Sequence, residues 1–205
     1  MLVVIFAILA AGYFCLPKYT VEVCRKKQFV IDKDFVSVRK SLSQGKFEEE
    51  ILKANNAVMI EKTWINKGFH IERPLKKDRY WEFNGSLLAK VGVNNPRTGQ
   101  MTVELKHDVL VTTDAIQLEA NLARPLEVGL TNLRQKIVMV PQGDKTLVRI
   151  EVSMRLSRFV PGFFREYAQK QLMQAADSSV DAFESVLKNL PPPKPGLNLP
   201  LGNLK

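Results

Sequence analysis

The chain has 205 residues, of which 45% are hydrophobic and 25% are charged, and its formal net charge at pH 7 is +9. This length and composition indicate one sizeable folded domain with appendages. The positive charge would suit an anionic partner such as a membrane face, but the basic residues recur along the chain without forming a block, so we interpret them first as an ordinary solvated surface. We expect no nucleic-acid partner, because no RNA-binding aromatic signature or finger motif is present.

The N-terminal stretch is almost wholly apolar over residues 2–16. Its length of about 16 residues is close to that of a spanning helix and also to that of a signal-peptide core. No basic residue precedes it, so we expect an N-terminal hydrophobic helix over residues 1–18 that anchors the chain in a membrane. A cleaved signal peptide and a buried soluble helix remain alternatives. The residues assigned to the anchor and its interfacial collar are Val4, Phe6, Leu9, Tyr13, Phe14 and Lys18.

Basic side chains follow the apolar run, beginning with Lys18 and Arg25. By the positive-inside rule they favour the cytoplasmic face for the domain. Next along the chain, residues 19–31 alternate as a strand does. Asp32 is then placed to cap a helix over residues 34–42. A second short helix is expected over residues 47–54, with acidic residues in its first turn.

The middle of the chain predicts an antiparallel meander. Apolar residues recur with a period of two, typical of half-buried strands, and turn-forming residues separate the runs. The strands are expected at residues 58–65, 79–83, 87–93, 103–111, 116–122 and 133–140.

The clearest pattern lies near the C-terminus. Residues 147–157 alternate almost without error, which predicts a strand with one wet face. From Phe164 the apolar residues step by three and four to Leu190, which predicts a long helix with one apolar stripe. The prolines at 191–193 end it, and residues 191–205 are expected to form an extended tail. The fold class is therefore α+β, a curved antiparallel sheet wrapped around a long C-terminal helix.

Reaction chemistry is not evident in the sequence. No nucleophile elbow, phosphate loop or metal-ligand spacing occurs, so we expect no metal and no cofactor, and Cys15 and Cys24 form no recognisable framework. His107 and Asp108 are neighbours on a strand and must face opposite sides. Arg149 is expected to face outward, as is Arg155.

Several ordered features resemble the START-like, or helix-grip, superfamily (SRPBCC), and within it the membrane-anchored members similar to polyketide cyclases/dehydrases and lipid-transport proteins. These features are the Leu-Pro-Lys-Tyr step at residues 16–19, the alternating valines Val21 and Val23, and the final strand and long helix. The resemblance implies a helix-grip domain over residues 19–190. It also implies an apolar cavity between sheet and helix that takes a lipid or other hydrophobic small molecule.

We therefore expect a membrane-tethered module that binds a hydrophobic ligand, with membrane lipid as a further partner. Two alternatives stay open: a structural protein that has a filled core and binds a protein partner, and an enzyme of the cyclase or hydratase kind, with His107 as its first suspect. The candidate cavity residues are Trp81, His107, Phe164, Ala168, Leu172 and Ala176.

Overall fold

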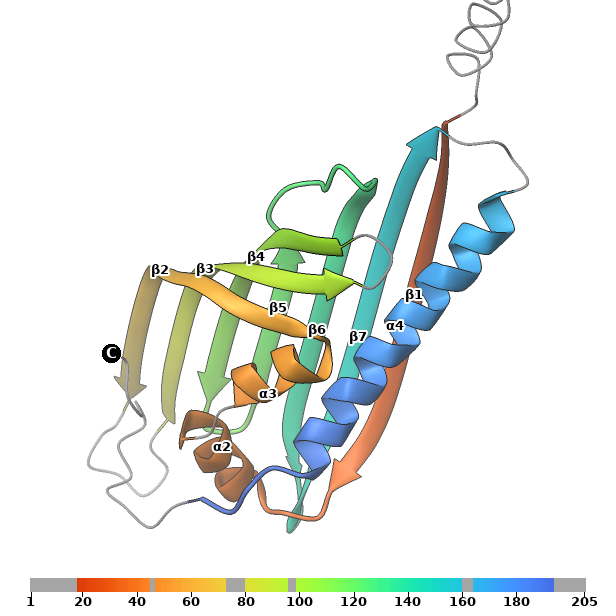
Figure 1. The fold of residues 1–205 in the computed structure, drawn as a ribbon. Helices are drawn as coiled ribbons and strands as arrows, with labels where there is room; N and C mark the ends of the chain where they lie inside the picture. The colour runs from red at the N-terminus through yellow and green to blue at the C-terminus, as the bar shows by residue number, and fades with distance from the viewer. Residues whose placement is uncertain (1–17, 45–46, 73–79, 96–98, 160–163, 194–205) are drawn as a thin grey trace, which may run out of the picture.

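The computed structural model describes residues 18–44, 47–72, 80–95, 99–159 and 164–193. They form one seven-stranded antiparallel sheet and three helices, and the strand order is β1-β7-β6-β5-β4-β3-β2 (Figure 1). The elements in chain order are β1 Lys18–Ile31, α2 Phe35–Gln44, α3 Phe47–Ala54, β2 Ala57–Glu72, β3 Tyr80–Asn95, β4 Gly99–Thr112, β5 Ile116–Leu122, β6 Leu130–Gln142, β7 Lys145–Phe159 and α4 Phe164–Lys188.

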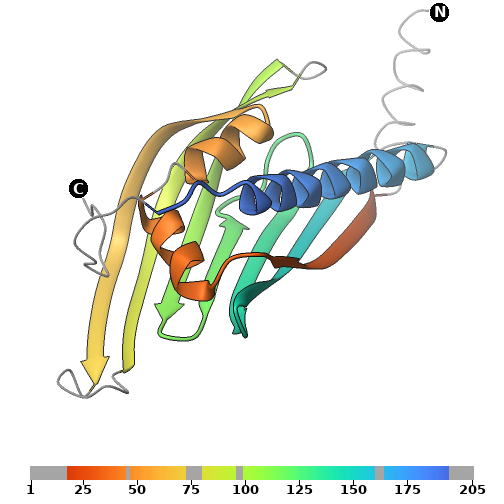
Figure 2. The ribbon, with the colours of Figure 1, turned by 90° about the horizontal axis from the view of Figure 1, so that it is seen from below.

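The helices lie on one side of the sheet, which we call the inner face (Figures 1 and 2). Helix α4 runs along β7 and β1, and α3 contacts both β2 and α4. The predicted alternation of residues 147–157 is confirmed. Val148, Ile150, Val152 and Met154 of β7 are buried on the inner face, with exposures of 9% or less.

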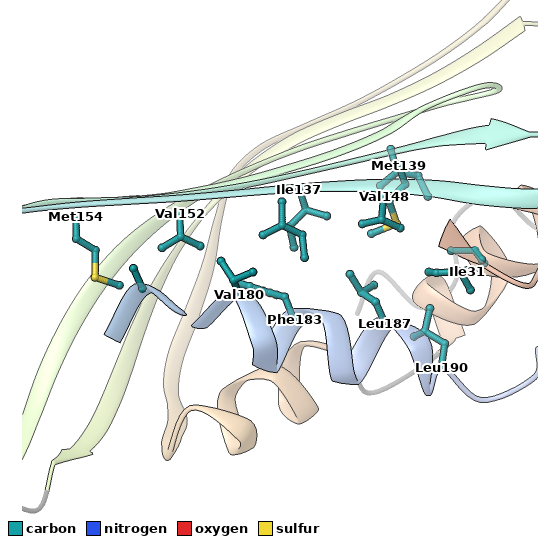
Figure 3. Packing of buried hydrophobic residues seen from close by; sticks show 14 of the residues in the cluster. Ile31, Ile137, Met139, Val148, Val152, Met154, Val180, Phe183, Leu187 and Leu190 are labelled. Carbon is teal, nitrogen blue, oxygen red and sulfur yellow. The ribbon is translucent and has the colours of Figure 1, made fainter. Parts of the chain in front are cut away.

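The main core lies between the inner face and α4. Figure 3 shows Val180, Phe183 and Leu187 of the helix pointing toward the apolar side chains of β6 and β7. Phe183 is 5% exposed and Leu187 fully buried. An apolar stripe at helical spacing on an alternating strand face explains why this long helix docks on the sheet.

The start of α4 lies outside this core. Its buried residues begin at Leu172, and the two turns before it hold none. Phe164 is 46% exposed and Tyr167 is 54% exposed. The predicted stripe therefore becomes a packing surface only from Leu172 onward.

The cap of α2 differs from the prediction. Asp34, not Asp32, accepts the hydrogen bond from the backbone N–H of Ser37, at 2.9 Å. Asp32 instead forms an ion pair with Lys145 across the β1–α2 connection, at 2.6 Å. A carboxylate three residues before a free N–H has the N-cap geometry, and Asp32 is too far from the first turn to provide it.

Strand β2 is an edge strand with two irregularities in its pairing with β3, between Met59 and Glu61 and between Trp64 and Asn66. Each bulge inserts one residue and reverses which side chains face inward. Val58 is 68% exposed, whereas Trp64, also even-numbered, pairs with buried Leu87 on the inner face.

Candidate functional site

Four aromatic side chains gather on the inner face of β2 and β3, and we call them the aromatic cluster: Trp64, Phe69, Trp81 and Phe83. The rings of Trp64 and Phe83 meet edge to face with centroids 6.3 Å apart, and those of Phe69 and Trp81 are 6.2 Å apart. A Cβ at Gly85 would lie only 2.7 Å from the Trp64 ring. The absence of a side chain at Gly85 therefore allows the indole to approach the sheet closely.

The centre of the inner face is only partly covered. Val109 of β4 pairs with Leu118 of β5, and both are half-buried. Their neighbours Ile116 and Ile137 are 2% and 3% exposed. Because α4 packs on β1 and β7, it covers β4 and β5 less closely, and Val109 and Leu118 stay half-buried.

A row of polar groups crosses this apolar surface. His107 of β4 lies between Leu87 of β3 and Ala120 of β5, and Ala120 pairs with Gln135 of β6. The Gln135 side-chain amide donates a hydrogen bond to the hydroxyl of Ser179 on α4, at 3.1 Å. This row places one hydrogen-bonded pair and one imidazole among aliphatic side chains, as expected for a mostly apolar binding surface with few polar anchors.

The His107 imidazole is neutral at pH 7. Burial lowers its pKa, with Glu48 raising it and Lys62 lowering it to smaller extents. Its Nε2 is inaccessible and no described residue hydrogen-bonds to it. Within the described part of the chain, this histidine therefore lacks the hydrogen-bonding partner that usually orients a general base. The described residues also contain no cluster of His, Cys, Asp or Glu suited to a metal ion.

A hollow of about 330 Å³ lies on the outer face of β2–β6. Its lining is mainly polar and its carboxylates are already paired. Asp108 accepts from the Ser86 hydroxyl and contacts Lys106, and Glu119 forms an ion pair with Arg134 at 2.9 Å. We therefore place the apolar site on the inner face and not in this hollow.

Solved structures with the same arrangement include the di-domain ARO/CYC StfQ of the steffimycin biosynthetic pathway, with a TM-score of 0.52 and 11% identity over 83% of this chain and 50% of that chain. The chain has the helix-grip fold. Zhui aromatase/cyclase from Streptomyces sp. R1128 aligns over 82% of this chain and 92% of its own, with 9% identity and a TM-score of 0.49. Truncated norcoclaurine synthase from Thalictrum flavum aligns over 83% and 96%, with 12% identity and a TM-score of 0.39.

The chain thus spans half the length of the di-domain protein. No protein-family model matches the sequence, and neither does any curated protein. At identities this low the likeness establishes the fold alone. The predicted helix-grip architecture is confirmed, and the ligand has to be inferred from the residues of this chain.

The helix-grip domain separates the six predicted cavity residues into three places. Trp81 and His107 lie on the inner face. Leu172 and Ala176 are buried in the main core. Phe164 is exposed at the opposite end of the strands from Trp81, and the remaining one, Ala168, is half-buried one turn further along α4. The outward orientation expected for Arg149 and Arg155 agrees with their exposure.

The predicted anchor lies outside the described residues except for its last member. Lys18 is the first residue of β1 and not part of a helix, so the strand begins one residue earlier than expected. None of the described helices is long and apolar enough to span a membrane. Most of the predicted tail, from residue 194 onward, also lies outside the described residues.

Sequence reasoning missed Phe69, Phe83 and Arg39 as members of the site. The guanidinium of Arg39 on α2 lies 4.6 Å from the centroid of the Trp81 ring. The alternation of Phe69 with Ile71 was a usable signal, but the bulge after Trp64 placed the two halves of β2 in different phases. No local pattern joins Arg39 to a ring more than forty positions away.

We expect the free energy of unfolding of this protein to decrease as the pH is lowered, because of the protonation of His107. Its pKa is lowered in the folded state, so the unfolded chain binds a proton first, near its ordinary value of about 6.5. The free energy of unfolding should therefore be fully retained above that pH and decrease below it. Urea unfolding of wild type and His107→Phe between pH 7.5 and 5.5 measures this slope.

The free energy of unfolding of His107→Phe should decrease less than that of wild type over this pH range. His70→Gln is the matched control, since His70 is exposed beside Glu72 at 3.4 Å. A slope that persists in His107→Phe and disappears in His70→Gln would show that another group is responsible.

Proposed function

We propose that the chain is a membrane-tethered module that binds a lipid or other hydrophobic small molecule on the inner face of its helix-grip domain. The observation that carries this proposal is the accessible apolar surface over β4 and β5, at Val109 and Leu118, bordered by the aromatic cluster. Apolar surface in the middle of a sheet is normally buried by the layer that packs on it. Here α4 lies to one side, over β1 and β7, and the incomplete burial of Val109 and Leu118 supports a ligand at this place.

The two alternatives have less support. A protein with a filled core would bury Val109 as completely as Ile137, which is 3% exposed. An enzyme of the cyclase or hydratase kind needs a positioned acid or base, and no described residue forms a hydrogen bond with Nε2 of His107. Binding without chemistry therefore accounts best for the inner face.

The tether is the other half of the proposal. The apolar run of residues 2–16 ends directly before β1. The start of α4 lies beside the start of β1 (Figure 1), where Phe164 and Tyr167 are about half exposed. Aromatic side chains favour the membrane–water interface. A domain held at this end would remain close to a bilayer from which an apolar ligand could enter.

Binding can be read from the protein's own tryptophans. The chain has two, Trp64 and Trp81, and both lie on the inner face. We expect ω-bromododecanol to quench their fluorescence with saturation in the full chain, held in nanodiscs of uncharged phosphatidylcholine. Val109→Phe fills the accessible surface and should weaken binding about tenfold, the size of an overpacking penalty.

The matched control is Leu110→Phe, which introduces the same side chain at the adjacent, half-buried position on the outer face. It should bind the alcohol as wild type does. A linear, unsaturated response in wild type, or equal losses in both variants, would count against an inner-face site.

A further inference from the structure

Arg39 is a half-buried cation on the inner face, held between a turn and two rings. Its Nη1 donates to the carbonyl oxygens of Thr112 and Thr113, at 3.3 and 3.2 Å. The centre of its guanidinium lies 4.6 Å from the Trp81 ring centroid and 5.7 Å from that of Phe35. The side chain is therefore fixed in position by contacts that leave its charge unneutralised.

No carboxylate compensates this charge among the described residues. Four other arginines form ion pairs within 3 Å, namely Arg25, Arg124, Arg134 and Arg155. The remaining arginines among the described residues, Arg149, Arg158 and Arg165, are exposed. Burial alone lowers the pKa of the Arg39 guanidinium, which nevertheless stays protonated. A partly buried charge without a counter-ion is costly, and this cost is removed when an anion binds.

The free edge of the guanidinium has the geometry that an anion requires. Neither Nε nor Nη2 of Arg39 donates a hydrogen bond within the described part of the chain. These two groups point in parallel and match the two oxygens of a carboxylate. The arginine is thus held through Nη1 and offers its bidentate edge.

Apolar surface continues from this edge. Phe69 and Ile71, on the same face of β2, are 39% and 43% exposed, and Phe69 contacts Trp81. A second cation, Lys67, lies 4.7 Å from the Trp64 ring centroid. The site therefore combines aromatic and aliphatic surface with positive charge, which suits a molecule that is apolar at one end and anionic at the other.

We propose that the ligand of the inner face is an amphipathic carboxylate, whose charged group binds the free edge of Arg39 and whose apolar part lies on the aromatic cluster and the surface over β4 and β5. This rests on the proposed function and narrows it, since an uncharged lipid would leave Arg39 without a counter-ion. Lys67 contributes long-range attraction for the same charge.

The test compares two probes that differ only in the headgroup, ω-bromododecanoate and ω-bromododecanol, each measured by tryptophan quenching of the full chain in nanodiscs of uncharged phosphatidylcholine. We expect Arg39→Met to weaken binding of ω-bromododecanoate about tenfold or more, as for loss of a charged hydrogen-bond pair. Binding of ω-bromododecanol should stay within about twofold of wild type. Each probe gives a ratio of apparent dissociation constants between wild type and variant. Because a probe partitions into the bilayer equally in both samples, comparing the two ratios removes the effect of partitioning.

Arg149→Met removes the same charge from the outer face, where the Arg149 guanidinium donates a hydrogen bond to the Gln28 side chain, at 3.2 Å. This variant should bind both probes as wild type does. If Arg39→Met weakened both probes equally, the arginine would act only through packing, and the carboxylate proposal would be overturned while the apolar site survived. If wild type bound neither probe, the proposed function itself would fail.

A second arm does not depend on the variant folding. In wild type, unbrominated dodecanoate should displace ω-bromododecanol, and raising the salt concentration should weaken dodecanoate alone. Displacement by dodecanoate that is independent of salt would contradict a charged contact. Lysophosphatidylcholine, which carries no net charge, should compete poorly, and strong competition by it would assign the site to a phospholipid headgroup instead.

Discussion

Phe183→Ala is expected to lower the free energy of unfolding by about 3–5 kcal/mol, the usual cost of removing a buried phenyl ring. Phe183 is 5% exposed and points from α4 toward the apolar face of β6 and β7 (Figure 3). Its neighbours along the helix, Val180 and Leu187, are buried as well. The surrounding sheet cannot collapse into the space, because Val152 and Ile150 are fixed by pairing on both sides.

Phe164→Ala makes the same chemical change in the same helix and provides the control. Phe164 is 46% exposed, so only about half of its transfer energy is at stake, and we expect a loss of about 1 kcal/mol. Urea unfolding followed by far-UV circular dichroism gives both values. Equal losses would mean that the first two turns of α4 belong to the core.

The prediction of the fold succeeded where the periodicity was long and regular. Strand β7 and helix α4 were both expected from their spacing, and so was the meander between them, because burial on one face requires a period of two in strands and of about 3.6 in helices. The prediction was weaker for β3, which the sequence divided into two strands at residues 79–83 and 87–93. Asn84, Gly85 and Ser86 resemble turn residues, but they continue the strand, with Gly85 under Trp64.

The site could be predicted only in part because its members come together through pairing and not through sequence spacing. Trp81 and His107 were named from their strand positions. Trp64 and Phe69 share a face only because a bulge lies between them, and a single sequence does not show where a bulge occurs. Arg39 reaches Trp81 from a helix, and no periodicity encodes the distance between them.

Two aspartates in the apolar leader should release the full chain from membranes. On an insertion scale, each Asp at the centre of a spanning helix costs about 2.5–3.5 kcal/mol, whereas Leu and Val are slightly favourable. The double variant Val4→Asp, Leu9→Asp therefore loses about 6–8 kcal/mol of insertion energy. This exceeds the effect of any substitution considered within the domain, and the chain should move from the carbonate-washed membrane pellet to the supernatant.

The matched control places the same two charges on the surface of the domain. Val36 and Val58 are 44% and 68% exposed, so the double variant Val36→Asp, Val58→Asp should remain with the membranes. A wild-type chain found in the supernatant would contradict the tether and favour a cleaved signal peptide, in which case the intact mass would lack the apolar leader. If the leader variant stayed in the pellet, the attachment would have to come from the domain, and the exposed aromatic side chains at the start of α4 would be the first to substitute.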